Sequence, residues 1–548
     1  MRKLIVLLLF FSVSTFAQNQ LFKHQEQFSR QDTLRGSITP QRSWWNLKHY
    51  SLAVEVFPET KTIKGKNTIT FEVLKPQQKM QIDLQKPMQI TKITHQNNNL
   101  NFTREGNVFW VNFKDNLLLN STQKITIHFN GKPREARNPP WDGGFTWKKD
   151  DNNIDFIASA NQGSGASIWW PNKDHYYDEP ENGMQISVTV PKHLTDVSNG
   201  QLTSVINHLN NKTTTYTWEV KNPINNYGVN INIGDYVHFK EIFNGEKGKL
   251  DCNYWVLKDN LEVAKKQFKQ AKMTLEAFEY WFGPYPFYED SYKLVEVPYL
   301  GMEHQSCVTY GNRYKNGYLG TDLSGTGIGL KFDFIIVHES GHEWFANSIT
   351  NKDVADMWIH ESFTSYSESL FLDYHFSTAD ANKYVIGTRR SIRNDKPLIG
   401  IYNVNHEGSG DMYYKGANML HTLRQMVNND EKWRAILRGL NTTFYHQQVT
   451  TQQIENYISE QSGLDLTGFF NQYLRTVKIP ILKIKKRRNK IKFRFKKSVK
   501  NLKMPIKLYL NNQEVWINVS KRKKTYTVPF KIKTIVVDEN FYVKTKKK

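Results

Sequence analysis

Three stretches in the first half of the chain alternate hydrophobic residues with polar or small ones. A period of two places every second side chain on the same face of a β-strand. The hydrophobic positions are Leu52, Val54 and Val56; Ile69, Phe71 and Val73; and Val229, Ile231 and Ile233. We therefore expect residues 18–240 to form a large antiparallel β domain.

The hydrophobic period changes to three and four residues after position 248. This spacing is typical of an amphipathic helix, and the Gly283-Pro284 pair predicts where the helix ends. The recurring residues are Leu261, Ala264, Phe268, Ala271, Leu275, Phe278 and Phe282. We interpret the glycine-containing segment 244–248 as a hinge. A mainly helical domain is expected over residues 241–475.

Alternation returns near the carboxyl end of the chain. Ile491, Phe493 and Phe495 are separated by single basic residues, and the runs 515–519 and 532–537 are also rich in strand-forming residues. Residues 476–548 are therefore expected to form a small β-sandwich. With the two preceding regions, this gives a multidomain α+β fold.

Basic residues are concentrated in this last region. Residues 476–548 hold 24 Lys and Arg against 3 Asp and Glu, whereas the net charge of the whole chain is +22. Two interpretations of the cationic face stay open: attachment to an anionic membrane or polysaccharide surface, or a solvated surface that keeps the protein soluble. No nucleic-acid partner is expected, because no motif that reads bases is present.

The amino terminus is typical of an exported protein. Two basic residues follow Met1, residues 4–13 are apolar, and Thr15-Phe16-Ala17 provides a small-residue cleavage site. Residues 1–17 are therefore predicted to be a secretory signal peptide, and the protein is expected in the periplasm or outside the cell. Cys252 and Cys307 are expected to be buried and unpaired, since a chain of this length can build its core without a disulfide.

One short motif carries the chemistry. In His338-Glu339-Ser340-Gly341-His342, the two histidines lie four residues apart, so both imidazoles leave the same face of a helix and can bind one zinc ion. Glu339 can take a proton from a metal-activated water. Glu361, which follows after eighteen residues, supplies a third ligand and leaves a coordination position open. Glu368 can support the ligands from behind. The motif therefore predicts metal-assisted hydrolysis.

The segment 338–368 resembles the gluzincin zinc aminopeptidases, a family that includes relatives of aminopeptidase N and of the leukotriene-processing epoxide hydrolase. Three further segments extend the resemblance over residues 48–480. Leu300-Gly301-Met302-Glu303-His304 is similar to the family's exopeptidase motif, Tyr413-Tyr414-Lys415-Gly416 to its Tyr-x-Lys-Gly motif, and Gln162 precedes Trp169-Trp170-Pro171 as in relatives. The resemblance implies an N-terminal β-saddle and a thermolysin-like catalytic domain.

The resemblance also implies roles for these residues. Glu303 is expected to bind the free α-ammonium of a peptide by a charge-assisted hydrogen bond, with Gln162 beside it. Gly301 and Met302 are expected to contact the substrate. Tyr413 is expected to donate a hydrogen bond to the tetrahedral oxyanion, with Tyr414 as the competing side chain.

Four positions depart from the family pattern. Relatives usually carry Gly at the positions of Leu300 and Ser362, and Asn at those of His304 and His360. These changes leave the ligands, base and oxyanion donor intact but alter the substrate cleft. The two histidines are expected to pack near the site rather than bind zinc.

The sequence thus predicts a zinc aminopeptidase with one zinc ion per chain, acting on peptides with a free amino terminus. Two alternatives stay open. One is a different hydrolase on the same scaffold, an endopeptidase or an epoxide hydrolase. The other is a non-catalytic surface-binding protein that uses its basic C-terminal domain.

Overall fold

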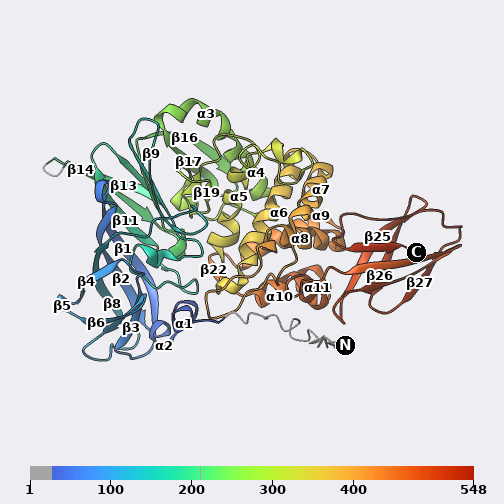
Figure 1. Ribbon diagram of the computed structural model, residues 1–548, viewed down its shortest axis with the longest axis horizontal. Coiled ribbons are helices and arrows are strands. Elements are labelled where there is room, and N and C mark those ends of the chain that lie inside the picture. The colour runs from blue at the N-terminus through green and yellow to red at the C-terminus, as the bar shows by residue number, and fades with distance from the viewer. Residues whose placement is uncertain (1–26, 210–211, 548) are drawn as a thin grey trace, which may run out of the picture.

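The computed structural model describes residues 27–209 and 212–547. The predicted signal peptide, residues 1–17, lies outside the described residues. Along the long axis of the molecule, a β-rich N-terminal part is followed by a helical part and then by a second β part at the C-terminal end (Figure 1). The predicted α+β class is confirmed.

The N-terminal part is built on an eight-stranded sheet in the order β13-β14-β11-β1-β2-β8-β4-β5. The strands are β1 (Trp45–Phe57), β2 (Thr62–Val73), β4 (Gln89–His95), β5 (Asn98–Asn99), β8 (Thr122–Gly131), β11 (Met184–Pro191), β13 (Gln201–His208) and β14 (Thr213–Val220). The alternation predicted for β1 and β2 is observed, since Leu52, Val54 and Ile69 are buried. The sheet is not purely antiparallel as expected, because β1 pairs in parallel with β11.

Two smaller sheets and two short helices complete this part. The sheets contain β12 (Thr195–Ser198), β15 (Ile231–Gly234), β10 (Asp155–Ala160) and β9 (Gly144–Lys149), and β3 (Lys79–Asp83), β7 (Val108–Asn112) and β6 (Asn101–Glu105); the helices are α1 (Arg30–Gly36) and α2 (Pro40–Ser43).

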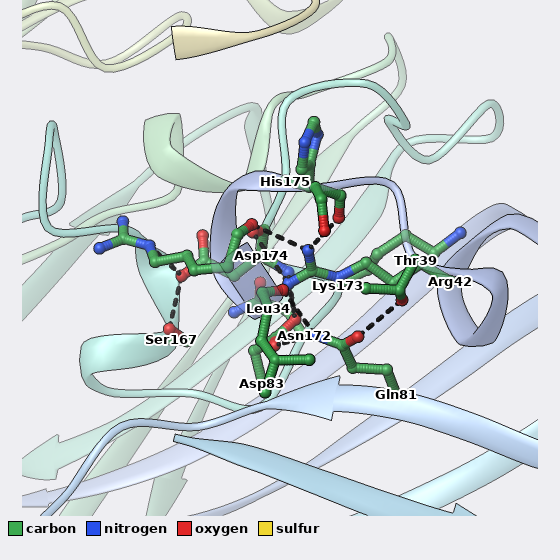
Figure 2. A network of polar contacts seen from close by, with 12 residues as sticks. Leu34, Thr39, Arg42, Gln81, Asp83, Ser167, Asn172, Lys173, Asp174 and His175 are labelled. Atoms are coloured by element: carbon green, nitrogen blue, oxygen red, sulfur yellow. Dashed lines mark hydrogen bonds and ion pairs between the residues drawn. The ribbon is translucent and has the colours of Figure 1, made fainter. Parts of the chain in front are cut away.

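A buried polar network fastens α2 to the sheets (Figure 2). Arg42 is fully buried and its Nη2 lies 2.7 Å from Oδ2 of Asp83. Asp83 also accepts hydrogen bonds from Gln81 Nε2, at 2.9 Å, and from the backbone N–H of Asp174, at 3.0 Å. Ser167 Oγ donates to Asp174. The network therefore holds the segment 167–174 in place, and this segment follows the loop that carries Gln162.

The central part begins with a five-stranded sheet in the order β16-β17-β18-β20-β19. The strands are β16 (Tyr236–Gly245), β17 (Gly248–Leu257), β18 (Tyr292–Glu296), β19 (Gly301–Met302) and β20 (Val308–Tyr310). The hinge predicted at 244–248 is wrong. This segment is the tight turn between β16 and β17, where Gly245 pairs with Gly248, so the domain boundary expected after residue 240 falls inside β16.

Helices form the rest of the central part. The helix predicted from 261 to 282 is interrupted at Phe268, giving α3 (Leu261–Gln267) and α4 (Lys269–Phe282), and α4 ends at Gly283 as expected. The further elements are α5 (Phe334–Gly341), α6 (Trp358–His375), α7 (Thr378–Gly387), α8 (Tyr414–Val427), α9 (Asp430–Thr443), α10 (Thr451–Ser462), α11 (Thr467–Tyr473), β21 (Ile349–Asn351) and β22 (Gln447–Val449). Helix α6 packs against α4, α5, α7 and α8.

The C-terminal part consists of a four-stranded and a three-stranded sheet, in agreement with the predicted small sandwich. The strands are β23 (Ile481–Arg487), β24 (Lys490–Lys496), β27 (Lys524–Thr527) and β29 (Lys544–Lys547), and β25 (Lys503–Leu510), β26 (Gln513–Ser520) and β28 (Ile535–Val537). Phe493 and Phe495 are buried. The backbone N–H of Tyr542 donates to Thr422 Oγ1 on α8 at 2.9 Å, which joins this part to the helices.

Cys252 and Cys307 are buried and free, as predicted. Within the described part of the chain, no helix is both long and apolar enough to cross a bilayer.

Candidate metal centre and peptide-binding cleft

Helix α5 presents the two predicted histidine ligands. Its first turn is capped by Asp333, whose side chain accepts hydrogen bonds from the backbone N–H groups of Ile335 and Ile336. His338 lies within the helix, and His342 follows its last residue with a helical backbone (φ −66°, ψ −18°). The four-residue spacing therefore keeps both imidazoles on one face.

The outer nitrogen of each imidazole is held by a hydrogen bond. His338 Nδ1 lies 2.8 Å from Oε1 of Glu368, and the other oxygen of Glu368 accepts a bond from Tyr384 Oη at 2.6 Å. His342 Nδ1 lies 3.1 Å from the carbonyl oxygen of Phe345. A hydrogen on each Nδ1 satisfies these acceptors and leaves the Nε2 lone pair free for a metal.

Both Nε2 atoms face Glu361 on α6. Oε2 of Glu361 lies 3.8 Å from His338 Nε2 and 3.5 Å from His342 Nε2. This oxygen is buried and has no hydrogen-bond partner among the described residues. Burial alone would raise the pKa of Glu361, but His342 and His338 outweigh it and hold the pKa below its ordinary value.

These three side chains fit a zinc ion. Their donor atoms all lie within 4.8 Å of one another, and all three residues are buried. An orphaned carboxylate oxygen between two imidazole nitrogens is costly unless a cation pairs with it. Two histidines and one glutamate form a typical catalytic zinc donor set that keeps one position open.

Glu339 lies beside this centre. Its carboxylate forms a second close group with Glu303 and His342, with donor atoms again within 4.8 Å. Burial raises the pKa of Glu339, although the neighbouring His338 and His342 oppose the shift. A carboxylate with a raised pKa is better suited to accept and return a proton near neutral pH.

Glu303 and Gln162 meet next to the metal ligands. Gln162 Nε2 donates to Glu303 Oε1 at 2.6 Å and to Glu361 Oε1 at 3.2 Å. Tyr227 Oη also donates to Glu303, at 3.4 Å. Burial raises the pKa of Glu303 to about 7; His342 opposes the shift, and Glu339 and Glu361 add to it. A cation beside Glu303 would oppose this shift and favour the charged carboxylate.

Strand β19 lies at the edge of the cleft, and Glu303 directly follows it. A Cβ on Gly301 would lie only 2.6 Å from Cγ2 of Ile335 and 3.5 Å from Cγ of Glu339, so a side chain at 301 would not fit without movement. Met302 is buried and lines the same cavity. The backbone of β19 therefore borders the place where a substrate would lie.

Tyr413 stands immediately before α8 with its ring stacked over that of His338, at a centroid distance of 6.0 Å. Burial raises the pKa of Tyr413 well above its ordinary value, and the carboxylates of Glu361 and Glu303 raise it further. The phenol therefore stays protonated and can donate a hydrogen bond.

One cavity of about 370 Å³ contains all the predicted site residues. They are Gln162, Gly301, Met302, Glu303, His338, Glu339, His342, Glu361 and Tyr413, and Tyr414 also lines it. Five separated segments of the chain thus meet in one cavity. The roles assigned to the residues stay predictions.

His304 and His360 lie outside this cavity. Burial lowers the pKa of each to about 3, so both are neutral. His360 Nε2 accepts a hydrogen bond from the backbone N–H of Asn351 at 2.8 Å. Their positions agree with packing near the site.

Three contributors to the site were not predicted from the sequence. Tyr384 on α7 supports Glu368, Tyr227 contacts Glu303, and Trp141 lines the mouth of the cavity with 68% of its surface exposed. No spacing rule connects these residues with the metal motif.

Two family models match the chain and agree with the resemblance expected from the sequence. Residues 46–227 match the Peptidase M1 N-terminal domain, and residues 266–473 match the Peptidase family M1 domain. Two curated relatives are "Aminopeptidase N" of Lactococcus lactis subsp. lactis, 23% identical over 79% of this chain and 51% of its own length, and "Probable aminopeptidase 2" of Sulfurisphaera tokodaii, 22% identical over 65% of this chain and 47% of its own length. The chain spans about half the length of these relatives.

Two solved structures share the fold. A two-domain M1 zinc metallopeptidase variant bound to L-tryptophan has a TM-score of 0.68 at 19% identity, covering 81% of this chain and 96% of its own. An M1 zinc metallopeptidase variant from Deinococcus radiodurans bound to a Tyr-Ser-Ala substrate has a TM-score of 0.67 at 19% identity, covering 81% and 98%.

Proposed function

Because the chain belongs to peptidase family M1, we propose that it is a zinc aminopeptidase that removes the first residue from peptides with a free amino terminus. The observation that carries this proposal is the Gln162–Glu303 hydrogen bond of 2.6 Å beside Glu361. It supplies a buried carboxylate for an α-ammonium within reach of the metal ligands.

The proposed reaction divides the work among five side chains. Zinc held by His338, His342 and Glu361 would supply a Lewis acid that lowers the pKa of water and polarises the scissile carbonyl. The Glu339 carboxylate accepts a proton from the attacking water and delivers it to the leaving nitrogen. Tyr413 Oη donates a hydrogen bond to the developing oxyanion.

The site favours an exopeptidase over an endopeptidase. The cavity does not extend past Glu303. The next three residues, His304, Gln305 and Ser306, are at most 1% exposed and do not line it. A peptide that continued past its α-nitrogen in this direction would meet buried backbone. Glu339 and Tyr413 in one cavity also count against a purely binding role.

The decisive experiment is metal analysis of the purified protein followed by a panel of aminoacyl fluorogenic substrates, with and without a chelator. We expect about one zinc ion per chain and chelator-sensitive release of the fluorophore. An epoxide substrate in the same panel tests the alternative that the protein is an epoxide hydrolase. Turnover of the epoxide without any aminoacyl hydrolysis would replace the proposal.

We further propose that the protein is exported and retained at an anionic surface. The basic and apolar pattern of residues 1–17 supports export. Retention is supported by a cavity of about 630 Å³ beside β25 and β26, bordered by one acidic residue, Asp465, and five basic ones: Lys500, Lys503, Lys521, Arg522 and Lys524. Salt-sensitive attraction to anionic lipid or polysaccharide follows from such a charge density.

A charge-reversal variant tests this retention without removing the sandwich. Changing Lys521, Arg522 and Lys524 to Glu should weaken sedimentation with phosphatidylglycerol vesicles at low salt, whereas the same change at Lys64, Lys66 and Lys92 of the N-terminal sheet should weaken it less. A parallel assay with an acidic polysaccharide separates the two surfaces. Equal retention of both variants on both surfaces would remove the proposal.

A further inference from the structure

A second cavity lies next to the site. It has a volume of about 480 Å³ and shares two residues, Trp141 and Leu300, with the cavity that holds the metal ligands. Its wall comes from the loop between β8 and β9, from β9 itself, and from the segments on either side of β19 and β20. The two cavities are therefore neighbours on either side of the Trp141–Leu300 pair.

Three basic side chains line the second cavity, which we call the cationic cavity. They are Arg137, Lys148 and Arg313. Lys148 Nζ donates to the carbonyl oxygen of Pro298 at 3.0 Å. Among the described residues, no carboxylate lies within ion-pair distance of any of the three. Their charges are available to an anionic ligand.

One acidic residue, Glu296, lines the same cavity, and both of its carboxylate oxygens already accept hydrogen bonds. Its carboxylate accepts hydrogen bonds from the backbone N–H of Leu257 at 2.8 Å and from Asn260 Nδ2 at 2.6 Å. It is also mostly buried, with 8% of its surface exposed. No ion pair joins Glu296 to the three basic residues, which outnumber it in the lining, so the cavity stays cationic.

The proposed reaction fixes the direction in which a peptide leaves the site. In the proposed function, Glu303 binds the α-ammonium of the peptide's first residue. The protein residues that follow Glu303 are buried and do not line the cavity. The leaving nitrogen receives its proton from Glu339, and Glu339 borders Gly301. The peptide residues after the scissile bond therefore lie along β19 and run antiparallel to it. They pass Gly301 and then Leu300, and so extend toward the cationic cavity.

We propose that the cationic cavity binds the C-terminal carboxylate of short peptide substrates, through Arg137 and Arg313. Guanidinium groups bind carboxylates by paired, charge-assisted hydrogen bonds, which suits a terminal carboxylate at the end of a short chain. The inference rests on the proposed aminopeptidase activity and deepens it, because it makes the enzyme a selector of short peptides with free carboxyl ends.

The test compares each peptide with its C-terminal amide, in a series from two to five residues, using the full zinc-loaded chain. The wild type should show a kcat/KM ratio of acid to amide of about ten at the best length, which corresponds to about 1.4 kcal/mol. The ratio should depend on length, because the distance between Glu303 and the cationic cavity is fixed.

The double variant Arg137→Gln, Arg313→Gln should bring this ratio close to one. The control variant Lys132→Gln, Lys149→Gln removes the same charge from the adjoining loop and strand β9 and should keep the ratio. Using the ratio cancels any general loss of activity. An amidated peptide with an internal Asp distinguishes a side-chain carboxylate from the terminal one, since it would recover the rate only if the cavity accepts side chains.

The outcomes separate this inference from the proposed function. Hydrolysis by the wild type with equal rates for acids and amides at all lengths overturns the inference and leaves the aminopeptidase in place. A ratio that persists in the double variant overturns the assignment to Arg137 and Arg313. Failure of the zinc-loaded protein to cleave any of the peptides overturns both.

Discussion

Gln162 donates a hydrogen bond to Glu303 across 2.6 Å, although 141 positions separate them in the chain. Gln162 comes from a loop of the N-terminal β part, whereas Glu303 follows β19 of the central sheet. The candidate binding site for the peptide's α-ammonium, formed by Gln162 and Glu303, therefore lies where two parts of the molecule meet. In the proposed function, specificity for a free amino terminus would depend on their relative position as well as on the metal centre.

Replacing Glu339 by Gln should slow catalysis strongly without emptying the metal site. The amide keeps the shape of the side chain but cannot accept a proton, so kcat should fall by roughly 10²- to 10⁴-fold. Zinc content should stay at the wild-type level, because the three ligands are unchanged. Turnover at the wild-type rate with zinc bound would exclude Glu339 as the base.

Replacing Glu303 by Ala should weaken the recognition of free amino termini. The wild type should discriminate strongly between a free peptide and its N-acetylated form, because only the free form carries an ammonium for Glu303. In the variant, kcat/KM should fall for the free peptide and the discrimination should shrink. An equal proportional loss on both peptides would assign Glu303 a merely structural role.

Replacing Tyr384 by Phe should weaken zinc binding. The change removes the hydrogen bond to Glu368, which in turn holds Nδ1 of His338. Loss of such an outer partner typically lowers metal affinity by about 10- to 100-fold. Competition with a chelator measures the affinity.

Tyr473→Phe provides the matched control for this prediction. It removes another buried phenol, which donates to the carbonyl oxygen of Tyr542 in the C-terminal part. Zinc affinity should be unchanged in this variant. If both variants lost zinc equally, the effect of Tyr384 would be attributed to general destabilisation.

Replacing Arg42 by Ala should destabilise the N-terminal part. It leaves Asp83 buried without its counter-charge, a change that typically costs about 3–5 kcal/mol. Thermal unfolding should begin at a lower temperature than in the wild type. Arg30→Ala removes an exposed ion pair with Glu105 and should have little effect. Equal melting of the wild type and the Arg42 variant would contradict the importance of the network.

The clustering of the two histidines was predictable because their geometry is local. His338 and His342 lie four residues apart, and the helix predicted for their motif is observed as α5. The strands that contain Val54 and Phe493 were predictable for the same reason, since burial follows a period of two. Such patterns need no knowledge of distant contacts.

Other features could not be read from local pattern. The parallel pairing of β1 with β11 depends on the path of more than a hundred intervening residues. Segment 244–248 has the composition of a linker, but the same composition suits a hairpin turn. The hydrophobic spacing continues across Phe268 although the helix does not. The family resemblance, not a local pattern, placed Gln162 beside Glu303. Neither the resemblance nor a local pattern predicted the contact of Tyr384 with Glu368.

The most direct test of the central claim is the rate at which the purified protein releases the first residue from a peptide with a free amino terminus, measured before chelation, after chelation and after adding back zinc. The account predicts release that disappears with the chelator and returns with about one zinc ion per chain. A peptide that is cleaved equally well without metal, or one that the zinc-loaded protein leaves intact, would contradict it.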